Sequence, residues 1–174
     1  MPVVRGEKNT YIGMDLGYRL PGEVIVSMDS YITEAIDKFP KEMMEIIKTT
    51  AGNHLFKVDV ACVKMCKRDN IIFHLLVANL LYLIKRAQPY IQPTIMFLTM
   101  RVINPDEGDW KKLRRVLSYL NATINSMKLH LNPNDLNVVH WWVEPSYGTH
   151  SDLKGQTGST ISIGKGCVTS ASKN

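Results

Sequence analysis

Apolar and polar positions alternate in two short runs near the start of the chain. "TYIGMDL" (10–16) and "EVIVSM" (23–28) flank "GYRLPG", whose Pro-Gly pair indicates a turn. We expect these two runs to form a β-hairpin. Asp29 is then a candidate N-cap for a helix that ends before Pro40. The apolar residues of this segment recur at helical spacing: Ile32, Ala35, Ile36 and Phe39.

Helical periodicity returns in the middle of the chain. "EMMEII" (42–47) indicates a short helix within an otherwise weak pattern. Asp69 is a second candidate N-cap, here for a helix over 70–86. Apolar residues cover nearly the whole circumference of that helix, so we expect it to be central to its subdomain. After a break that contains two prolines, "TIMFLTMRVI" (94–103) predicts another helix.

A further helix follows "NPDEGD" (104–109), and its pattern is amphipathic. One face is apolar and consists of Trp110, Leu113, Val116, Leu117 and Leu120. The opposite face carries four basic side chains: Lys111, Lys112, Arg114 and Arg115. Taken by themselves, these four charges are typical of a solvated helix face.

After Ile124 the pattern changes to short strands separated by Gly, Asn and Pro. The runs are "SMKLHL" (126–131), "LNVVHWWVE" (136–144), "GSTISI" (158–163) and "CVTSA" (167–171). The pattern as a whole predicts an α+β chain, in which a helical segment precedes a sheet that looks unfinished.

The composition is that of a globular protein, with 45% hydrophobic and 21% charged residues. A formal net charge of +5 suits a polyanionic partner, although the basic residues are spread along the chain. Cys62, Cys66 and Cys167 lack the spacing of a disulfide framework or a zinc site and indicate reduced intracellular thiols. The longest apolar run (71–84) is too short to span a bilayer, so we expect no membrane association. From the reduced thiols we expect an intracellular location, either cytoplasmic or nuclear.

Glu144 is the candidate for metal chemistry, because a strand-like run delivers its carboxylate into a turn. A two-metal phosphodiesterase site needs several carboxylates that converge from rigid elements, typically a central strand. Asp152 is the one nearby acidic partner in the sequence, eight positions further on. From the residues alone, we interpret Glu144 as the polar end of a core strand. The alternative interpretation is a metal ligand.

The long run "FHLLVANLLYLIKRAQPYIQPTIMFLTMRVINPDEGDWKKLRRVLSYLNATI" (73–124) resembles the C-terminal reverse transcriptase region of copia-type retrotransposon Pol polyproteins. In that family a "LV..LLYL...RPDI" helix pair precedes a helix that ends in "R.L.YL.GT". "YIGMDL" (11–16) resembles the family's "FLGM" strand beyond the polymerase active site. "WWVEPSYGTHSDLKGQTGSTISIGKG" (141–166) resembles the opening of the attached RNase H domain. The motifs occur in the family's order and cover nearly the whole chain.

This resemblance implies three segments and a partner. Residues 1–28 would be the end of the polymerase palm with its β-hairpin, 29–125 the helical thumb and connection, and 126–174 the N-terminal strands of an incomplete RNase H-like domain. The thumb and connection lie along the template–primer duplex in such enzymes. The resemblance therefore implies phosphate contacts to an RNA–DNA or DNA duplex from Lys111, Lys112, Arg114 and Arg115. The other Pol domains are further possible partners.

Departures from the family pattern predict the loss of catalysis. The paired aspartates of the polymerase belong upstream of "YIGMDL", and Tyr90 replaces the Asp of "RPDI". Glu144 occupies the place of the first catalytic Asp of RNase H, and the remaining carboxylates of that set would lie beyond Asn174. The intact parent would be a Mg²⁺-dependent RNA-directed DNA polymerase and ribonuclease H. For this chain we expect a fragment without catalysis of its own and without a cofactor, in which Glu144 is a remnant. The alternative is a non-enzymatic nucleic-acid-binding module.

Overall fold

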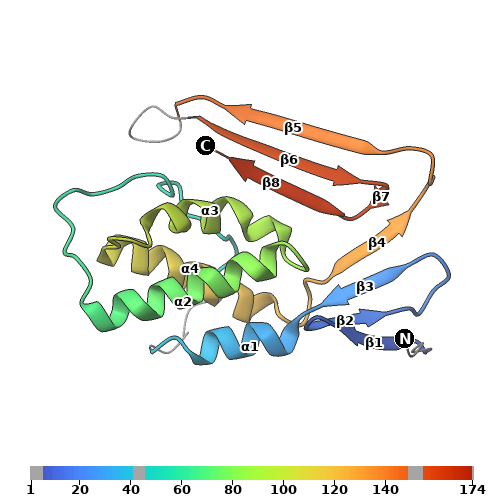
Figure 1. The fold of residues 1–174 in the computed structure, drawn as a ribbon, viewed down its shortest axis with the longest axis horizontal. Coiled ribbons are helices and arrows are strands. Elements are labelled where there is room, and N and C mark those ends of the chain that lie inside the picture. The colour runs from blue at the N-terminus through green and yellow to red at the C-terminus, as the bar shows by residue number, and fades with distance from the viewer. Residues whose placement is uncertain (1–5, 41–45, 149–154, 174) are drawn as a thin grey trace.

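Four α-helices and two antiparallel sheets make up the part of the chain that the computed structural model describes, residues 6–40, 46–148 and 155–173 (Figure 1). The elements follow one another as β1 (Lys8–Tyr11), β2 (Met14–Gly17), β3 (Val24–Ser27), α1 (Asp29–Asp37), α2 (Lys67–Ile84), the 3-10 turn η1 (Pro89–Ile91), α3 (Gln92–Arg101), α4 (Glu107–Thr123), β4 (Leu129–Pro133), β5 (His140–Ser146), β6 (Gln156–Ser162), β7 (Gly164–Lys165) and β8 (Thr169–Lys173). The α+β class expected from the sequence is confirmed at this level.

The first apolar run forms two strands instead of one. β1 and β2 pair with each other across a tight turn at Ile12 and Gly13, whose φ angles are +50° and +73°. Positive φ at both central residues is typical of a type I′ hairpin turn. The sequence pattern concealed this turn because Ile12 is β-branched and apolar, and so continues the strand periodicity. The expected hairpin between the next two strands is present, since β2 pairs antiparallel with β3.

The helices for which Asp29 and Asp69 were proposed as N-caps begin one and three residues earlier than expected. α1 begins at Asp29 itself after Met28, and the carboxylate of Asp29 forms an ion pair with the ammonium of Lys128. α2 begins at Lys67, where the Cys66 Sγ accepts the backbone N–H of Asp69 at 3.5 Å. The first turn of α2 is polar, so its apolar periodicity begins only after the helix has started. Most of the short helix proposed over 42–47 lies outside the described residues.

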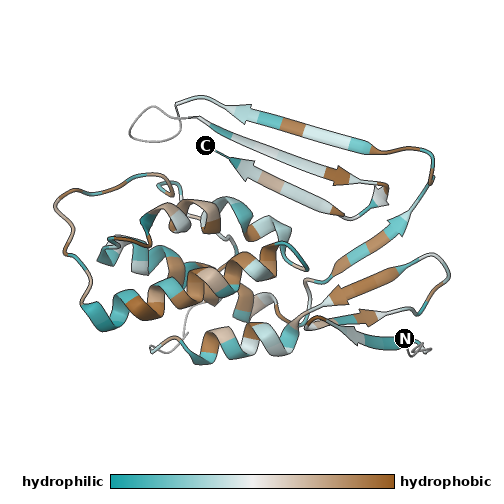
Figure 2. Cartoon of the chain, in the orientation of Figure 1, coloured by the Kyte–Doolittle hydropathy of each residue, from teal (hydrophilic) through white to brown (hydrophobic). Residues whose placement is uncertain are grey.

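The core lies among the four helices (Figure 2). Its most buried side chains come from α2, α3 and α4, and include Phe73, Leu76, Leu80, Leu83, Ile95, Leu98, Leu113 and Leu117. α2 is apolar on nearly all sides, as expected, but only one side is covered: Ile71 and Leu75 are exposed. α2 therefore has one buried and one exposed side, although its residues are apolar on both sides.

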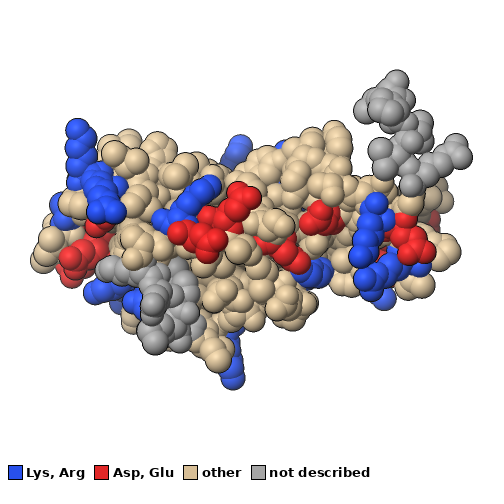
Figure 3. All heavy atoms as spheres, turned by 90° about the horizontal axis from the view of Figure 1, so that it is seen from below, with Lys and Arg blue, Asp and Glu red and all other residues tan. Residues whose placement is uncertain are grey.

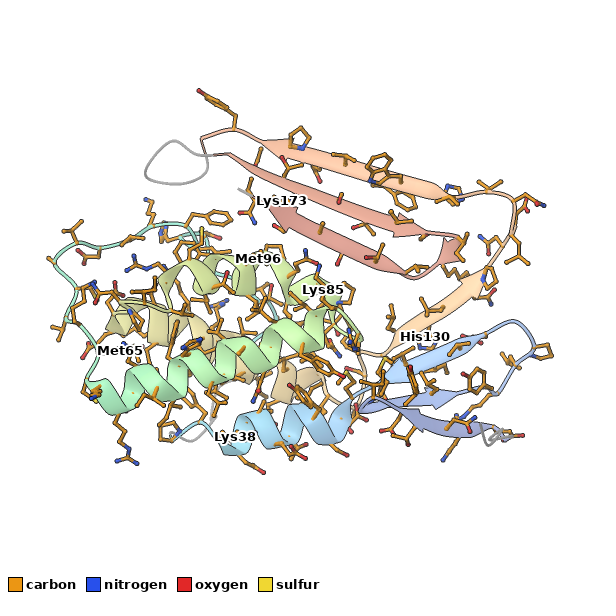
Figure 4. The ribbon with its side chains drawn as sticks, viewed as in Figure 1. Lys38, Met65, Lys85, Met96, His130 and Lys173 are labelled. Atoms are coloured by element: carbon orange, nitrogen blue, oxygen red, sulfur yellow. The ribbon has the colours of Figure 1, made fainter. Side chains whose placement is uncertain are left out.

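The later strands divide between two sheets. β4 joins the N-terminal strands by pairing antiparallel with β3, which gives the order β1-β2-β3-β4-β7. The second sheet has the order β5-β6-β8, so β5 is an edge strand. All of its residues are exposed, so the expectation that Glu144 ends a core strand is wrong. This C-terminal sheet lies over α3, on the side of the helices where Lys85 and Met96 are labelled (Figure 4). The ammonium of Lys85 donates to the carbonyl of Ser170 on β8 at 2.6 Å.

Candidate nucleic-acid interface

The start of α4 is fixed by a reciprocal cap and a buried ion-pair network. The carboxylate of Asp106 accepts the backbone N–H of Asp109 at 3.0 Å, and the carboxylate of Asp109 accepts that of Asp106 at 3.2 Å. Arg101, at the end of α3, donates to Asp106 at 2.8 Å and to Asp109 at 2.9 Å. Burial lowers the pKa of Arg101, but the hydrogen bonds and charges of the two carboxylates outweigh it and raise that pKa. The network therefore joins α3 to α4 and sets the position of the basic residues that follow.

The amphipathic character predicted for α4 is confirmed. The five apolar residues named from the sequence are all buried, namely Trp110, Leu113, Val116, Leu117 and Leu120. On the other side Lys111 is exposed, whereas Arg114 and Arg115 are half-buried. The basic face is thus partly covered and is not simply solvated.

The ammonium of Lys112 contacts three groups of the fold. Its ammonium donates to the carbonyl of Lys57 at 2.7 Å and lies 3.8 Å from the carboxylate of Asp109. It also sits 4.3 Å from the ring centroid of Phe97, which is a cation–π distance. Burial lowers the pKa of Lys112, although the charge of Asp109 opposes that shift. These contacts hold the ammonium inside the fold.

The segment 47–55, between α1 and α2, covers the same side of α4. The guanidinium of Arg115 donates to the Thr49 hydroxyl at 2.7 Å, and its buried Nε has no acceptor among the described residues. Between this segment and α4 lies a hollow of about 470 Å³. Its lining consists of Ile47, Gly52, Asn53, His54, Leu55, Lys111, Lys112, Arg114, Arg115 and Ser118.

The four basic residues proposed from the sequence thus meet at one concave site. No Asp or Glu lines the hollow among the residues that the structure describes. A concave surface with one sign of charge concentrates the electrostatic potential and attracts anions. Lys111 and Arg114 also line a neighbouring hollow of about 400 Å³, where Asp69 and Glu107 add negative charge. Figure 3 shows basic and acidic side chains interspersed over one face of the molecule. Sequence reasoning missed His54, because the pattern of its segment is weak and gives no signal that the segment folds over α4.

Glu144 lies in a different and smaller hollow, about 200 Å³ in volume, between β5 and the start of α3. It is exposed, and it is the one carboxylate among the described lining residues, which otherwise are small, amide or aromatic, such as Gln92 and Trp142. Groups of three or more His, Cys, Asp or Glu placed to hold a metal do not occur within the described ranges. The proposed partner Asp152 lies outside those ranges. The residues described around Glu144 therefore do not fit Mg²⁺, which needs several oxygen ligands in octahedral geometry.

Comparisons with protein-family models, with curated proteins and with solved structures find no match to this chain. In the described part of the chain, no helix is both long enough and apolar enough to cross a membrane.

Proposed function

We propose that this chain is a fragment of a copia-type reverse transcriptase and RNase H polyprotein, which binds the backbone of a nucleic acid duplex and has no catalysis of its own. The resemblance of its ordered motifs supports the relationship. The observation that carries the binding role is the hollow on α4, where Lys111, Lys112, Arg114 and Arg115 converge without a carboxylate among the described residues. Such a site favours phosphates, which position a duplex without reading its sequence.

The four basic residues contribute in different ways. Lys111 is exposed and lines the hollow, so it is the best placed to contact a phosphate directly. Arg114 lines the same hollow and adds to its positive charge. Lys112 is tied to Lys57 and Asp109, so it adds to the positive potential without leaving its contacts. Arg115 holds the Thr49 hydroxyl and thereby keeps the covering segment in place.

The non-catalytic part of the proposal follows from Glu144. A hybrid nuclease of this type needs several carboxylates around its metal ions, and the hollow beside Glu144 has one among the described residues. Purified protein incubated with Mg²⁺ and a labelled RNA–DNA hybrid should leave the RNA intact and the primer unextended. Cleavage or extension that survives repurification would refute this part.

The binding part is tested with two double variants that have the same charge. Lys111→Glu/Arg114→Glu and Lys165→Glu/Lys173→Glu each contain two reversals of two charge units, so both lower the formal net charge from +5 to +1. The control lysines are exposed and lie on the strands β7 and β8. Fluorescence anisotropy with an RNA–DNA hybrid should show a large loss of affinity for the α4 variant and a small loss for the control. Equal losses would show that net charge alone causes binding and would remove α4 as the site.

The alternative is a nucleic-acid-binding module unrelated to any polymerase. The same hollow favours it as strongly, because the phosphate contacts do not depend on ancestry. The two are separated by adding an upstream palm fragment of a copia-type enzyme. Co-purification with that fragment favours the polyprotein relationship, whereas a chain that binds the duplex but does not co-purify with the fragment favours the independent module.

A further inference from the structure

The outer edge of β5 is open to a further strand. Among the described residues β5 pairs with β6 alone, whereas β8, at the opposite edge of the sheet, lies against α3 (Figure 1). Every residue of β5 is exposed, including Trp141 at 68%, Trp142 at 55% and Val143 at 51%. The exposed apolar surface continues beyond the two ends of the strand with Val139 and Tyr147. A long apolar edge strand is a template for pairing with another chain.

The hydrogen bonds of β6 show which backbone groups of β5 point toward this open edge. The N–H of Val168, just before β8, donates to the carbonyl of Ile161 at 2.9 Å, so the backbone of Ile161 faces β8. Successive residues of a strand face opposite sides, so the residue before Ile161, which pairs with Trp142, faces β5. Trp142 therefore directs its N–H and C=O toward β6. Its neighbours Trp141 and Val143 direct theirs toward the open edge.

These directions suit a second copy of the same strand. In an antiparallel pair, residues whose backbone groups point toward the partner strand stand opposite one another. A two-fold axis through Trp142 meets this condition, because Trp141 then lies opposite the partner's Val143, and Val143 opposite the partner's Trp141. Each of these two pairs exchanges both of its N–H···O=C bonds. The edge of β5 is thus complementary to itself.

The side chains favour this register over its neighbours. His140, Trp142 and Glu144 share one face of β5, and the His140 ring stacks on Trp142 at 5.5 Å. With the axis through Trp142, each His140 lies opposite the partner's Glu144, and an imidazole N–H donates to a carboxylate in either protonation state. Moving the axis by one residue in either direction places Glu144 opposite an apolar side chain, Val138 or Trp142. The pairing of polar groups therefore selects Trp142 as the centre.

We propose that two copies of this chain associate through β5, with the two strands antiparallel and Trp142 on the two-fold axis. Two three-stranded sheets then form one six-stranded sheet, which removes the open edge of both. Because the interface is the same patch on each copy, association closes at the dimer. The dimer uses no residue of α4, so it is independent of the proposed duplex binding.

Sedimentation equilibrium of the full chain tests the dimer, with two variants of one residue. Val143→Pro removes an N–H that bonds to the partner and leaves the ladder to β6 intact, because that N–H points away from β6. Two hydrogen bonds are lost per dimer, so the dimer should dissociate about tenfold or more readily. Val143→Thr is the matched control, since Thr is also β-branched and keeps the N–H, and it should dimerise as the unmodified chain does. Far-ultraviolet circular dichroism checks that both variants fold.

A cysteine at the centre tests the register without a proline. Opposite residues of a non-hydrogen-bonded pair have Cα atoms about 4.5 Å apart, within reach of a disulfide, so Trp142→Cys should form a disulfide to itself across the dimer on mild oxidation. The two copies of Trp141 are diagonal neighbours, about 7–8 Å apart, so Trp141→Cys should cross-link far more slowly. Mass spectrometry of the linked peptides separates these bonds from those of the native thiols, Cys62, Cys66 and Cys167.

Three results would each overturn the proposal. The first is a chain that stays monomeric at the highest concentration at which it is soluble, which would leave the edge of β5 to a strand of another protein. The second is a Val143→Pro variant that dimerises as readily as Val143→Thr. The third is equal cross-linking of the two cysteine variants. Any of them would leave the duplex-binding role of α4 standing, and loss of duplex binding would leave the dimer standing.

Discussion

Asp109 should stabilise the fold far more than the exposed Glu107 in the same turn of α4, and Asp109→Ala tests this. The carboxylate is 1% exposed, caps the helix by accepting the backbone N–H of Asp106, and is bound by Arg101 at 2.9 Å. Removal of one partner of a buried ion pair costs about 3–5 kcal/mol. Arg101 is 21% exposed and keeps its bond to Asp106, so we expect the lower end of that range, about 3 kcal/mol.

For a chain of this length, about 3 kcal/mol corresponds to a decrease in Tm of about 6–12 °C. Urea unfolding followed by far-ultraviolet circular dichroism measures the free energy of unfolding directly. Glu107→Ala is the control, because Glu107 is an exposed carboxylate in the same first turn and its loss should cost about 0.3–1 kcal/mol. Asp109→Asn keeps an acceptor for the cap but removes the charge, so it should fall between the two. If Asp109→Ala costs no more than Glu107→Ala, the network does not hold the start of α4 and the reasoning fails.

Three smaller predictions concern the core, the turn between β1 and β2, and the thiols. Phe73→Ala should lower the free energy of unfolding by about 3–5 kcal/mol, measured in urea, because its ring is fully buried. Leu75→Ala on the exposed side of α2 should cost far less, and similar losses for the two variants would contradict the core assignment. Ile12→Asn should stabilise the protein by about 1 kcal/mol, since Asn tolerates the positive φ of a type I′ turn better than Ile; a loss of stability in the same assay would contradict the turn type. Cys66 is exposed, while burial raises the pKa of the Cys167 thiol. Iodoacetamide at neutral pH should therefore label Cys66 before Cys167, as followed by mass spectrometry, and faster labelling of Cys167 would contradict the structure.

The sequence predicted those elements whose periodicity and end signals agree. α4 is the clearest case, because "NPDEGD" contains the acidic cap and the apolar residues after it recur at helical spacing. α2 was located correctly by its apolar residues but not by its start, since the capping group is a thiol, which is not among the usual N-cap side chains. Local signals of this kind do not depend on the rest of the fold.

What the sequence could not predict depends on contacts between distant segments. The pairing of β4 with β3 joins residues about 100 positions apart, and alternation alone does not choose a partner strand. The same holds for the segment that places His54 and Thr49 over the basic residues of α4. The position of a strand within a sheet was equally hidden, so the strand of Glu144 was expected in the core and lies exposed at an edge.

The central claim is that α4 binds the phosphate backbone, and the salt dependence of duplex binding tests it most directly. The affinity of the unmodified chain for an RNA–DNA hybrid is measured by fluorescence anisotropy between about 50 and 200 mM salt. We expect log K to fall linearly with log salt, and Lys111→Glu/Arg114→Glu to flatten the slope by about 1.8, or about 0.9 for each phosphate that the variant no longer neutralises. The variant with reversed Lys165 and Lys173 should keep the original slope. A folded, monodisperse chain that does not bind the hybrid at the lowest salt, or an α4 variant with an unchanged slope, would contradict the claim.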